Sequence, residues 1–152
     1  MMRRLSCLAA GALILVLVPL AAQQSGGEQK AAPRKLKIKL NYTGTGTVDS
    51  KHQIIIFLFD TPDFMQGAMP VASQRGDAKD ATVTFSDVPA ATVYAAALFD
   101  PTGGYDGQSG PPPSGSSGGM YSKTPPAPEP IKIEPGKTVE VELAFDDSFK
   151  IP

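Results

Sequence analysis

The chain has very little of the residues on which most catalytic and redox chemistry depends. Its 152 residues include no tryptophan, one cysteine (Cys7) and one histidine (His52). A single histidine excludes the two- and three-histidine zinc sites of metalloenzymes within one chain. No nucleophile, base and orienting group can be assembled from the remaining residues either. We therefore expect a protein that is not an enzyme.

The single cysteine belongs to an N-terminal segment with the features of a signal peptide. Arg3 and Arg4 supply a positive start, Leu8 to Leu20 is an apolar run, and small residues follow up to Ala22. The run is too short for the roughly 20 residues of a membrane-spanning helix. Residues 1–22 are predicted to be a signal peptide, with export to the periplasm or the extracellular space and no membrane span after cleavage.

Removal of this segment leaves a chain without cysteine, so no disulfide can stabilise its fold. About 130 residues remain, enough for one domain with an ordinary hydrophobic core. Two of the 14 basic residues, Arg3 and Arg4, leave with the signal peptide, whereas all 15 acidic residues stay. The mature chain is therefore slightly acidic, and nucleic acid and anionic lipid are not expected partners.

Alternating apolar and polar residues predict β-strands along much of the remaining chain. Residues 35–42 and 138–145 alternate in this way, as half-buried strands do. The lysines of the first segment favour a solvent-exposed or edge strand. Residues 53–60, QIIIFLFD, are apolar on both faces, which is typical of a central strand. No window shows a sustained helical period.

The stretch from Ala81 to Asp106 is the segment around which the fold is expected to be organised. Residues 81–86 alternate, Pro89 interrupts the run, and residues 93–99 are apolar on both faces. This pattern predicts a hairpin of two strands that ends in an acidic, glycine- and proline-rich exit.

Glycine and proline mark two long connections. Residues 61–80 are interpreted as a connection with a short strand near Val71. Half of residues 101–130 are glycine or proline, so this segment is predicted to be a long irregular loop without regular structure. The two connections are expected to lie close together at one end of the domain.

Together these patterns predict an all-β protein with one domain. The expected fold is an antiparallel β-sandwich of about seven strands that spans residues 34–146. Residues 23–33 are predicted to be a flexible linker, and residues 147–152 a tail.

The order IIIFLFD, TVTFSDVPAATVYAAALFDPTGGYDG and IKIEPGKTVEVEL resembles the transthyretin-like, carboxypeptidase-regulatory-like β-sandwiches. It is still more similar to an uncharacterised family of exported bacterial proteins. The resemblance covers about Leu36 to Phe145 and implies a Greek-key topology. The hydroxyisourate hydrolases of the transthyretin group use several histidines and a C-terminal Tyr-Arg-Gly-Ser. This chain has one histidine and ends in Phe-Lys-Ile-Pro, so that activity is not carried over.

Three aspartates are candidate ligands of a calcium ion. Asp100 and Asp106 bound a short loop, and Asp60 ends a neighbouring strand. Calcium prefers such oxygen ligands but usually takes six to eight of them. The exported family tends to have a denser acidic loop at this position. The alternative is that the carboxylates stabilise turns by accepting hydrogen bonds from the backbone.

Tyr105, Met120 and Tyr121 are candidate contacts for a partner. Aromatic rings among glycines can form a platform for a sugar or a peptide, and the alternative is that these rings fold back over the sandwich. Residues 115–119 match the G-x-S-x-G motif of hydrolases. That motif needs a strand before it and a helix after it, and here both sides are predicted to be loop.

The sequence thus predicts an exported, non-catalytic binding or structural accessory domain of the bacterial envelope. Its partner, an envelope protein or a glycan, would contact the loop end of the sandwich. One alternative is a calcium-stabilised adhesion or folding module that uses Asp100 and Asp106. A hydrolase is the other.

Overall fold

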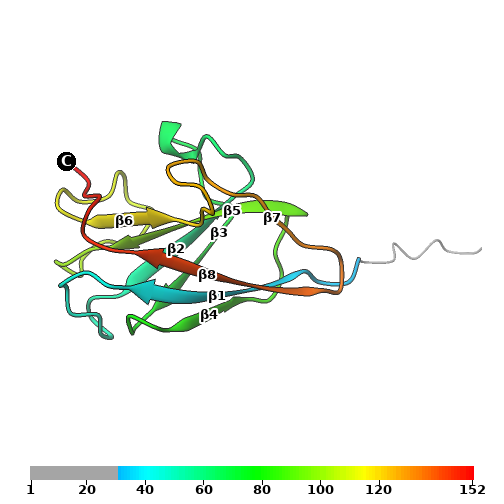
Figure 1. Cartoon of the computed structure of the whole chain (residues 1–152), viewed down its shortest axis with the longest axis horizontal. Helices are drawn as coiled ribbons and strands as arrows, with labels where there is room; N and C mark the ends of the chain where they lie inside the picture. The colour runs from blue at the N-terminus through cyan, green and yellow to red at the C-terminus, as the bar shows by residue number, and fades with distance from the viewer. Residues whose placement is uncertain (1–30) are drawn as a thin grey trace, which may run out of the picture.

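The computed structural model describes residues 31–152, which form two β-sheets packed face to face (Figure 1). The predicted signal peptide and most of the predicted linker lie outside the described residues. A helix long and apolar enough to cross a membrane is not found in residues 31–152. The strands are β1 (Lys35–Tyr42), β2 (Ile54–Phe59), β3 (Ala72–Gly76), β4 (Thr82–Phe85), β5 (Thr92–Phe99), β6 (Ser117–Met120), β7 (Ile131–Lys132) and β8 (Thr138–Phe145), and one 3-10 turn, η1, spans Phe64–Gln66.

The smaller sheet has the strand order β4-β1-β8, and the larger has the order β3-β2-β5-β6, with β7 also paired to β5. All pairings are antiparallel except that of β1 with β8. The prediction of an antiparallel sandwich is therefore wrong for this pair. Parallel neighbours need a long crossover connection, and here nearly the whole domain separates the two strands.

Strand β1 lies in the middle of the smaller sheet, so its lysines do not mark an edge. Leu36, Ile38 and Leu40 point inward and are buried, while the lysine side chains face outward. Lys37 donates to Glu140 of β8 at 2.8 Å. Lys37 thus pairs across strands with an acidic neighbour, which a single strand's pattern does not reveal.

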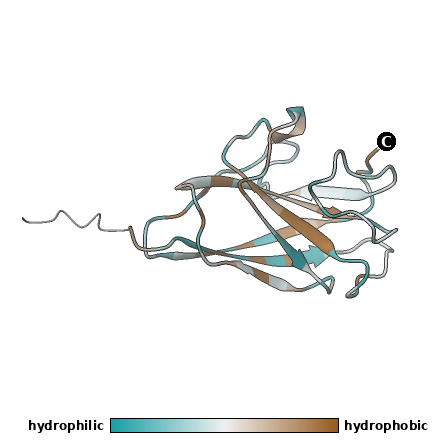
Figure 2. Cartoon of the chain, turned by 180° about the vertical axis from the view of Figure 1, so that it is seen from behind, coloured by the Kyte–Doolittle hydropathy of each residue, from teal (hydrophilic) through white to brown (hydrophobic). Residues whose placement is uncertain are grey.

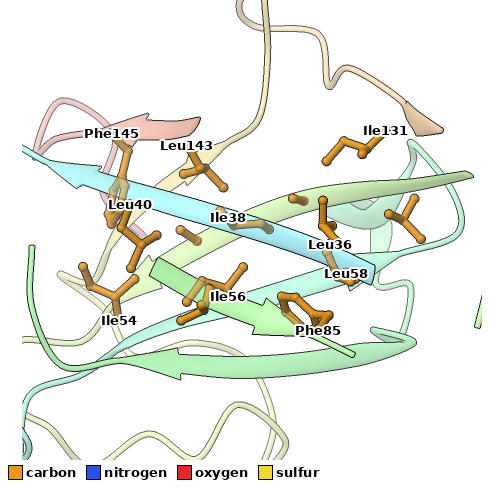
Figure 3. Close-up of a cluster of buried hydrophobic side chains, with 14 of the residues drawn as sticks. Leu36, Ile38, Leu40, Ile54, Ile56, Leu58, Phe85, Ile131, Leu143 and Phe145 are labelled. Atoms are coloured by element: carbon orange, nitrogen blue, oxygen red, sulfur yellow. The ribbon is translucent and has the colours of Figure 1, made fainter. Parts of the chain in front are cut away.

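The core between the sheets is formed by alternate residues of β1 and β2 together with β4, β5 and β8. Leu36, Ile38 and Leu40 of β1 lie across from residues of β2 (Figure 3). Ile54, Ile56 and Leu58 are fully buried there. The prediction that residues 53–60 contain the central strand is confirmed, because β2 lies between β3 and β5.

The predicted hairpin at residues 81–99 does not form. β4 pairs with β1 in one sheet, and β5 pairs with β2 in the other. Val88, in the connection between them, is buried in the core, and its N–H donates to the carbonyl of Arg34 at 2.9 Å. The connection therefore crosses from one sheet to the other and closes that end of the sandwich.

The segment 101–130 is not irregular throughout, because β6 forms within it and pairs with β5. The glycines of β6 are required by the close contact of this strand with its neighbours. A side chain at Gly119 would overlap Phe145 of β8, so only glycine lets the two sheets approach here. The prediction of a segment without regular structure is thus wrong at Ser117–Met120.

The last six residues do not form a separate tail. The Gly118 N–H donates to the Phe149 carbonyl at 3.1 Å, and the Ile151 N–H donates to the Ser116 carbonyl at 2.9 Å. Lys150 forms an antiparallel bridge with Ser117. Residues 147–152 are therefore part of the sandwich, along the free edge of β6.

Candidate functional site

A second apolar cluster lies on the outer face of the larger sheet. Side chains alternate between the two faces of a strand, so Ile55, Phe57 and Phe59 of β2 point away from the core between the sheets. With Leu98 of β5 and Phe64 they form a separate buried cluster. Figure 2 shows the hydrophobic colour concentrated on strands, whereas the surrounding loops are mostly pale or teal. Loops, and not a third sheet, cover this outer face.

The first cover is the loop that carries η1. The Phe64 ring stacks on the Phe59 ring, with 4.7 Å between centroids and 16° between planes. Gly67 ends the turn at φ +91°, a conformation that favours glycine. Phe64 is buried, whereas two methionines of the same loop are exposed, Met65 by 63% and Met69 by 75%.

The second cover is the loop after β5, and Asp100 organises it. The buried Asp100 carboxylate accepts hydrogen bonds from the N–H groups of Thr102, Gly104 and Tyr105 and from the Thr102 hydroxyl. Burial alone would raise the pKa of Asp100, but these donors outweigh it and hold the pKa below its ordinary value. The Tyr105 ring packs on the outer cluster, and its hydroxyl donates to the Gly110 carbonyl at 2.9 Å.

Arg75 of β3 ties this loop to the sheet edge. Its guanidinium donates to the carbonyls of Asp106, at 2.8 Å, and Tyr105, at 3.5 Å. These bonds bring the connection 61–80 and the segment 101–130 into contact. The Asp106 carboxylate accepts bonds from the Ser109 hydroxyl and from the N–H groups of Gln108 and Ser109, which lower its pKa to about 2.

The three candidate calcium ligands therefore have different surroundings. The carboxylates of Asp100 and Asp106 each accept bonds from their own loop, which is the turn-stabilising alternative, and Asp60 is exposed. In residues 31–152 no group of three or more histidine, cysteine, aspartate or glutamate side chains is placed to hold a metal ion. Calcium binding through these aspartates stays a hypothesis.

A groove of about 1270 Å³ lies between the two covers and extends past β6 to the end of β8. Its floor includes Phe57 and Leu98, and Asp146 is the only charged residue that lines it within the described chain. All three methionines of residues 31–152 line this groove: Met65, Met69 and Met120. The η1 loop and the segment after β6 stand on the side of the larger sheet that faces away from β1 (Figure 1).

The structure brings two of the three predicted partner contacts together. Tyr105 and Met120 both pack on the outer cluster and line the groove. Tyr121 packs instead on the core between the sheets, because neighbouring residues of an extended chain face opposite ways. Met65 and Met69 were not predicted from the sequence, although the two apolar faces of β2 require a cover on each side.

The serine of the G-x-S-x-G motif belongs to a different cluster, at the end of the sandwich. Ser117 is almost fully buried and donates to Asp147 at 2.6 Å, and Lys150 donates to the Ser117 oxygen at 3.0 Å. Asp147 also accepts bonds from the Tyr42 hydroxyl and from Thr45. The Ser117 hydroxyl is thus one of several donors that share a single carboxylate.

These contacts explain the ionisation of the cluster. Hydrogen bonds from Ser117, Tyr42 and Thr45 hold the pKa of Asp147 well below its ordinary value. Burial, with the bond to Asp147, raises the pKa of Tyr42. An aspartate stabilised in its charged form is a poor proton acceptor, so the cluster acts as an anchor between β1, β6 and the C-terminal segment.

Comparison of the chain with family models, with curated proteins and with solved structures finds no match. The candidate site is therefore defined by its own geometry: an apolar groove with a sheet floor, walls formed by loops and by the C-terminal segment, and exposed methionines at its rim.

Proposed function

We propose that this protein is an exported, non-catalytic binding domain of the bacterial envelope, and that the groove on its larger sheet binds the partner. The exposure of Met65 and Met69 beside a buried aromatic floor is the observation that carries the proposal. Phe149, which is 48% exposed, lines the same groove. Single exposed apolar residues are normal, but several around one groove are typical of an interaction site.

The chemistry of the groove favours an apolar segment of an envelope protein over a glycan. Methionine side chains are flexible and polarisable, and they adapt to apolar partners of varied shape. The Tyr105 ring packs down on the sheet and its hydroxyl bonds within the loop, so it is not presented as a sugar platform. A nearly uncharged lining leaves few groups to bond sugar hydroxyls.

The fold that carries this site is proposed to be a Greek-key sandwich of the transthyretin-like type. Two observations support this finer assignment. The chain forms two packed sheets, and consecutive strands repeatedly change sheet, as in β1 to β2, β3 to β4 and β4 to β5. The sequence resemblance over Leu36 to Phe145 is a resemblance of fold motifs and is compatible with a binding role.

Binding of N-phenyl-1-naphthylamine, whose fluorescence rises in apolar surroundings, tests the proposed site. We expect saturable binding to the purified chain. Replacing Met65 and Met69 by glutamine removes two contacts of about 0.5 kcal/mol each and should weaken binding about fivefold. Because both side chains are exposed, the free energy of unfolding should change by less than about 0.5 kcal/mol.

Lys37→Gln, on the outer face of the smaller sheet, is the matched control and should bind the probe like the unmodified chain. Saturable binding that the methionine substitutions leave unchanged would place the probe elsewhere. Absence of saturable binding would also contradict the proposal.

A further inference from the structure

The chain's own C-terminal segment already occupies one edge of this site. Residues 149–151 run antiparallel to β6, and the N–H groups of Gly118 and Gly115 donate to the carbonyls of Phe149 and Ile151 at 3.1 and 2.8 Å. The Ile151 N–H donates back to Ser116 at 2.9 Å. The edge of β6 therefore accepts an extended chain through main-chain bonds, as sheet edges do in peptide recognition.

The side chains of this segment show which sequence the edge accepts. Phe149 lies against Gly118, where an added Cβ would come within 3.1 Å of the ring. Ile151 packs on the outer cluster, and both residues line the groove. Lys150, between them, bonds to Ser117 on the other side. The complementary peptide is thus an extended one with apolar residues two positions apart.

The segment is firmly anchored at Asp147 and more weakly held beyond it. Asp147 accepts bonds from three residues in two other parts of the fold. Residues 149–151 add three main-chain bonds, each of which exchanges with water at small net gain, and two bonds from the exposed Lys150 side chain. Nearly half of the Phe149 side chain stays in solvent. An external strand can replace this end without breaking the anchor.

We propose that the edge of β6 is a docking site for an extended apolar segment of a protein partner, and that residues 149–151 fill it until the partner displaces them. The inference rests on the proposed function, since the same groove receives the apolar side chains. A segment tethered next to its site has a millimolar effective concentration. The partner must outcompete it, so only a well-matched strand binds.

A peptide with the sequence of residues 146–152 tests the docking site by nuclear magnetic resonance. The probe is titrated into the full chain and into its Ile151→Pro variant, in which proline removes the N–H that bonds to Ser116. We expect the amide signals of Gly115 and Gly118 to shift on addition of peptide. The dissociation constant should be at least about tenfold lower for the variant, because its own segment no longer competes.

Two controls keep the result interpretable. A peptide with serine at the positions of Phe149 and Ile151 should cause no shift. Because only the peptide is changed, this control does not depend on the folding of a protein variant. Gly118→Val, added to Ile151→Pro, should abolish the response because its side chain takes the place of the phenyl ring. Binding that is equal in the chain and in Ile151→Pro, or that the serine peptide reproduces, overturns the inference.

Failure of the inference is distinct from failure of the proposed function. If N-phenyl-1-naphthylamine binds at the methionine rim while the peptide causes no shift in either protein, strand docking is excluded and the groove remains a binding site. If the probe does not bind saturably, the proposed function itself is contradicted.

Discussion

The two faces of the larger sheet are built from the same strand but are closed in different ways. On the inner face, Ile54, Ile56 and Leu58 have no exposed surface, because the smaller sheet covers them along its length. On the outer face, Phe57 and Phe59 are covered by loops and retain 8% and 7% exposure. A sheet can match another sheet residue by residue, whereas loops cover it in patches and leave a groove.

The smaller sheet and the outer loops are also held in place by different kinds of interaction. The smaller sheet is held by regular ladders, such as the eight paired positions between β1 and β8. The outer loops depend on individual side chains, chiefly Asp100 and Arg75. Stability is therefore concentrated in the inner layer, and adaptability in the outer one, where binding sites commonly lie.

The largest expected effect comes from matched substitutions on the two faces of β2. Ile56→Ala leaves a cavity between two rigid sheets and should lower the free energy of unfolding by about 4 kcal/mol. Ile55→Ala should cost only about 2 kcal/mol, since a loop can relax into the space. Urea unfolding measures both. Equal decreases in the free energy of unfolding would show that the outer loops are as rigid as the smaller sheet.

The fold was predictable where the pattern of one strand decides its position. The two apolar faces of β2 required burial on both sides, and the alternation in residues 138–145 matches β8. Which strands pair with each other was harder to predict from the sequence. The pairing of β1 with β8 joins residues about a hundred positions apart, and no local signal distinguishes it from an edge strand.

The glycine content of residues 101–130 led to the wrong prediction at β6. Glycines usually break strands, but here they are needed for close contact with Phe145 and Phe149. In the site, Tyr105 and Met120 were selected as candidates because they are large apolar residues among glycines, and both line the groove. Met65 and Met69 could not be selected, since no periodic pattern in residues 61–80 shows that Phe64 is buried while the two methionines are exposed.

The anchor at Asp147, which joins the inner layer to the β6 edge, gives the next largest effect. Asp147→Ala leaves the buried hydroxyls of Tyr42 and Ser117 without their acceptor. The free energy of unfolding should fall by about 2–3 kcal/mol. Because the pKa of Asp147 is lowered on folding, its contribution is complete above the ordinary value of 3.8.

The sign of the pH dependence follows from that shift. As pH falls below 3.8, protons bind the unfolded chain before they bind folded Asp147, so the contribution is lost. The difference between the unmodified chain and Asp147→Ala should be constant from about pH 7 to pH 5 and should shrink below about pH 4. Urea unfolding across this range measures it. A difference that does not shrink contradicts the assigned role.

Arg75→Gln tests how the outer loop is held and should hardly affect global stability. The side chain is exposed, so the free energy of unfolding should change by less than about 0.5 kcal/mol. The bonds to the carbonyls of Tyr105 and Asp106 are lost, however. Amide hydrogen exchange at residues 105–109 should become faster. Lys132→Gln, an exposed substitution on β7, is the control and should leave those rates unchanged.

The smallest expected effect is that of calcium on the melting temperature. A bound ion would hold the loop between Asp100 and Asp106 in place, whereas the smaller sheet is held by strand pairing. The Asp100 carboxylate already accepts bonds from Thr102, Gly104 and Tyr105, and an ion would have to displace some of these donors. Calcium also needs more oxygen ligands than these aspartates supply. We therefore expect the same melting temperature in millimolar calcium and in chelator. A ligand that binds only the folded state raises that temperature, so a clear increase with calcium, lost in Asp106→Asn, would establish an ion-stabilised loop in place of a hydrogen-bonded one.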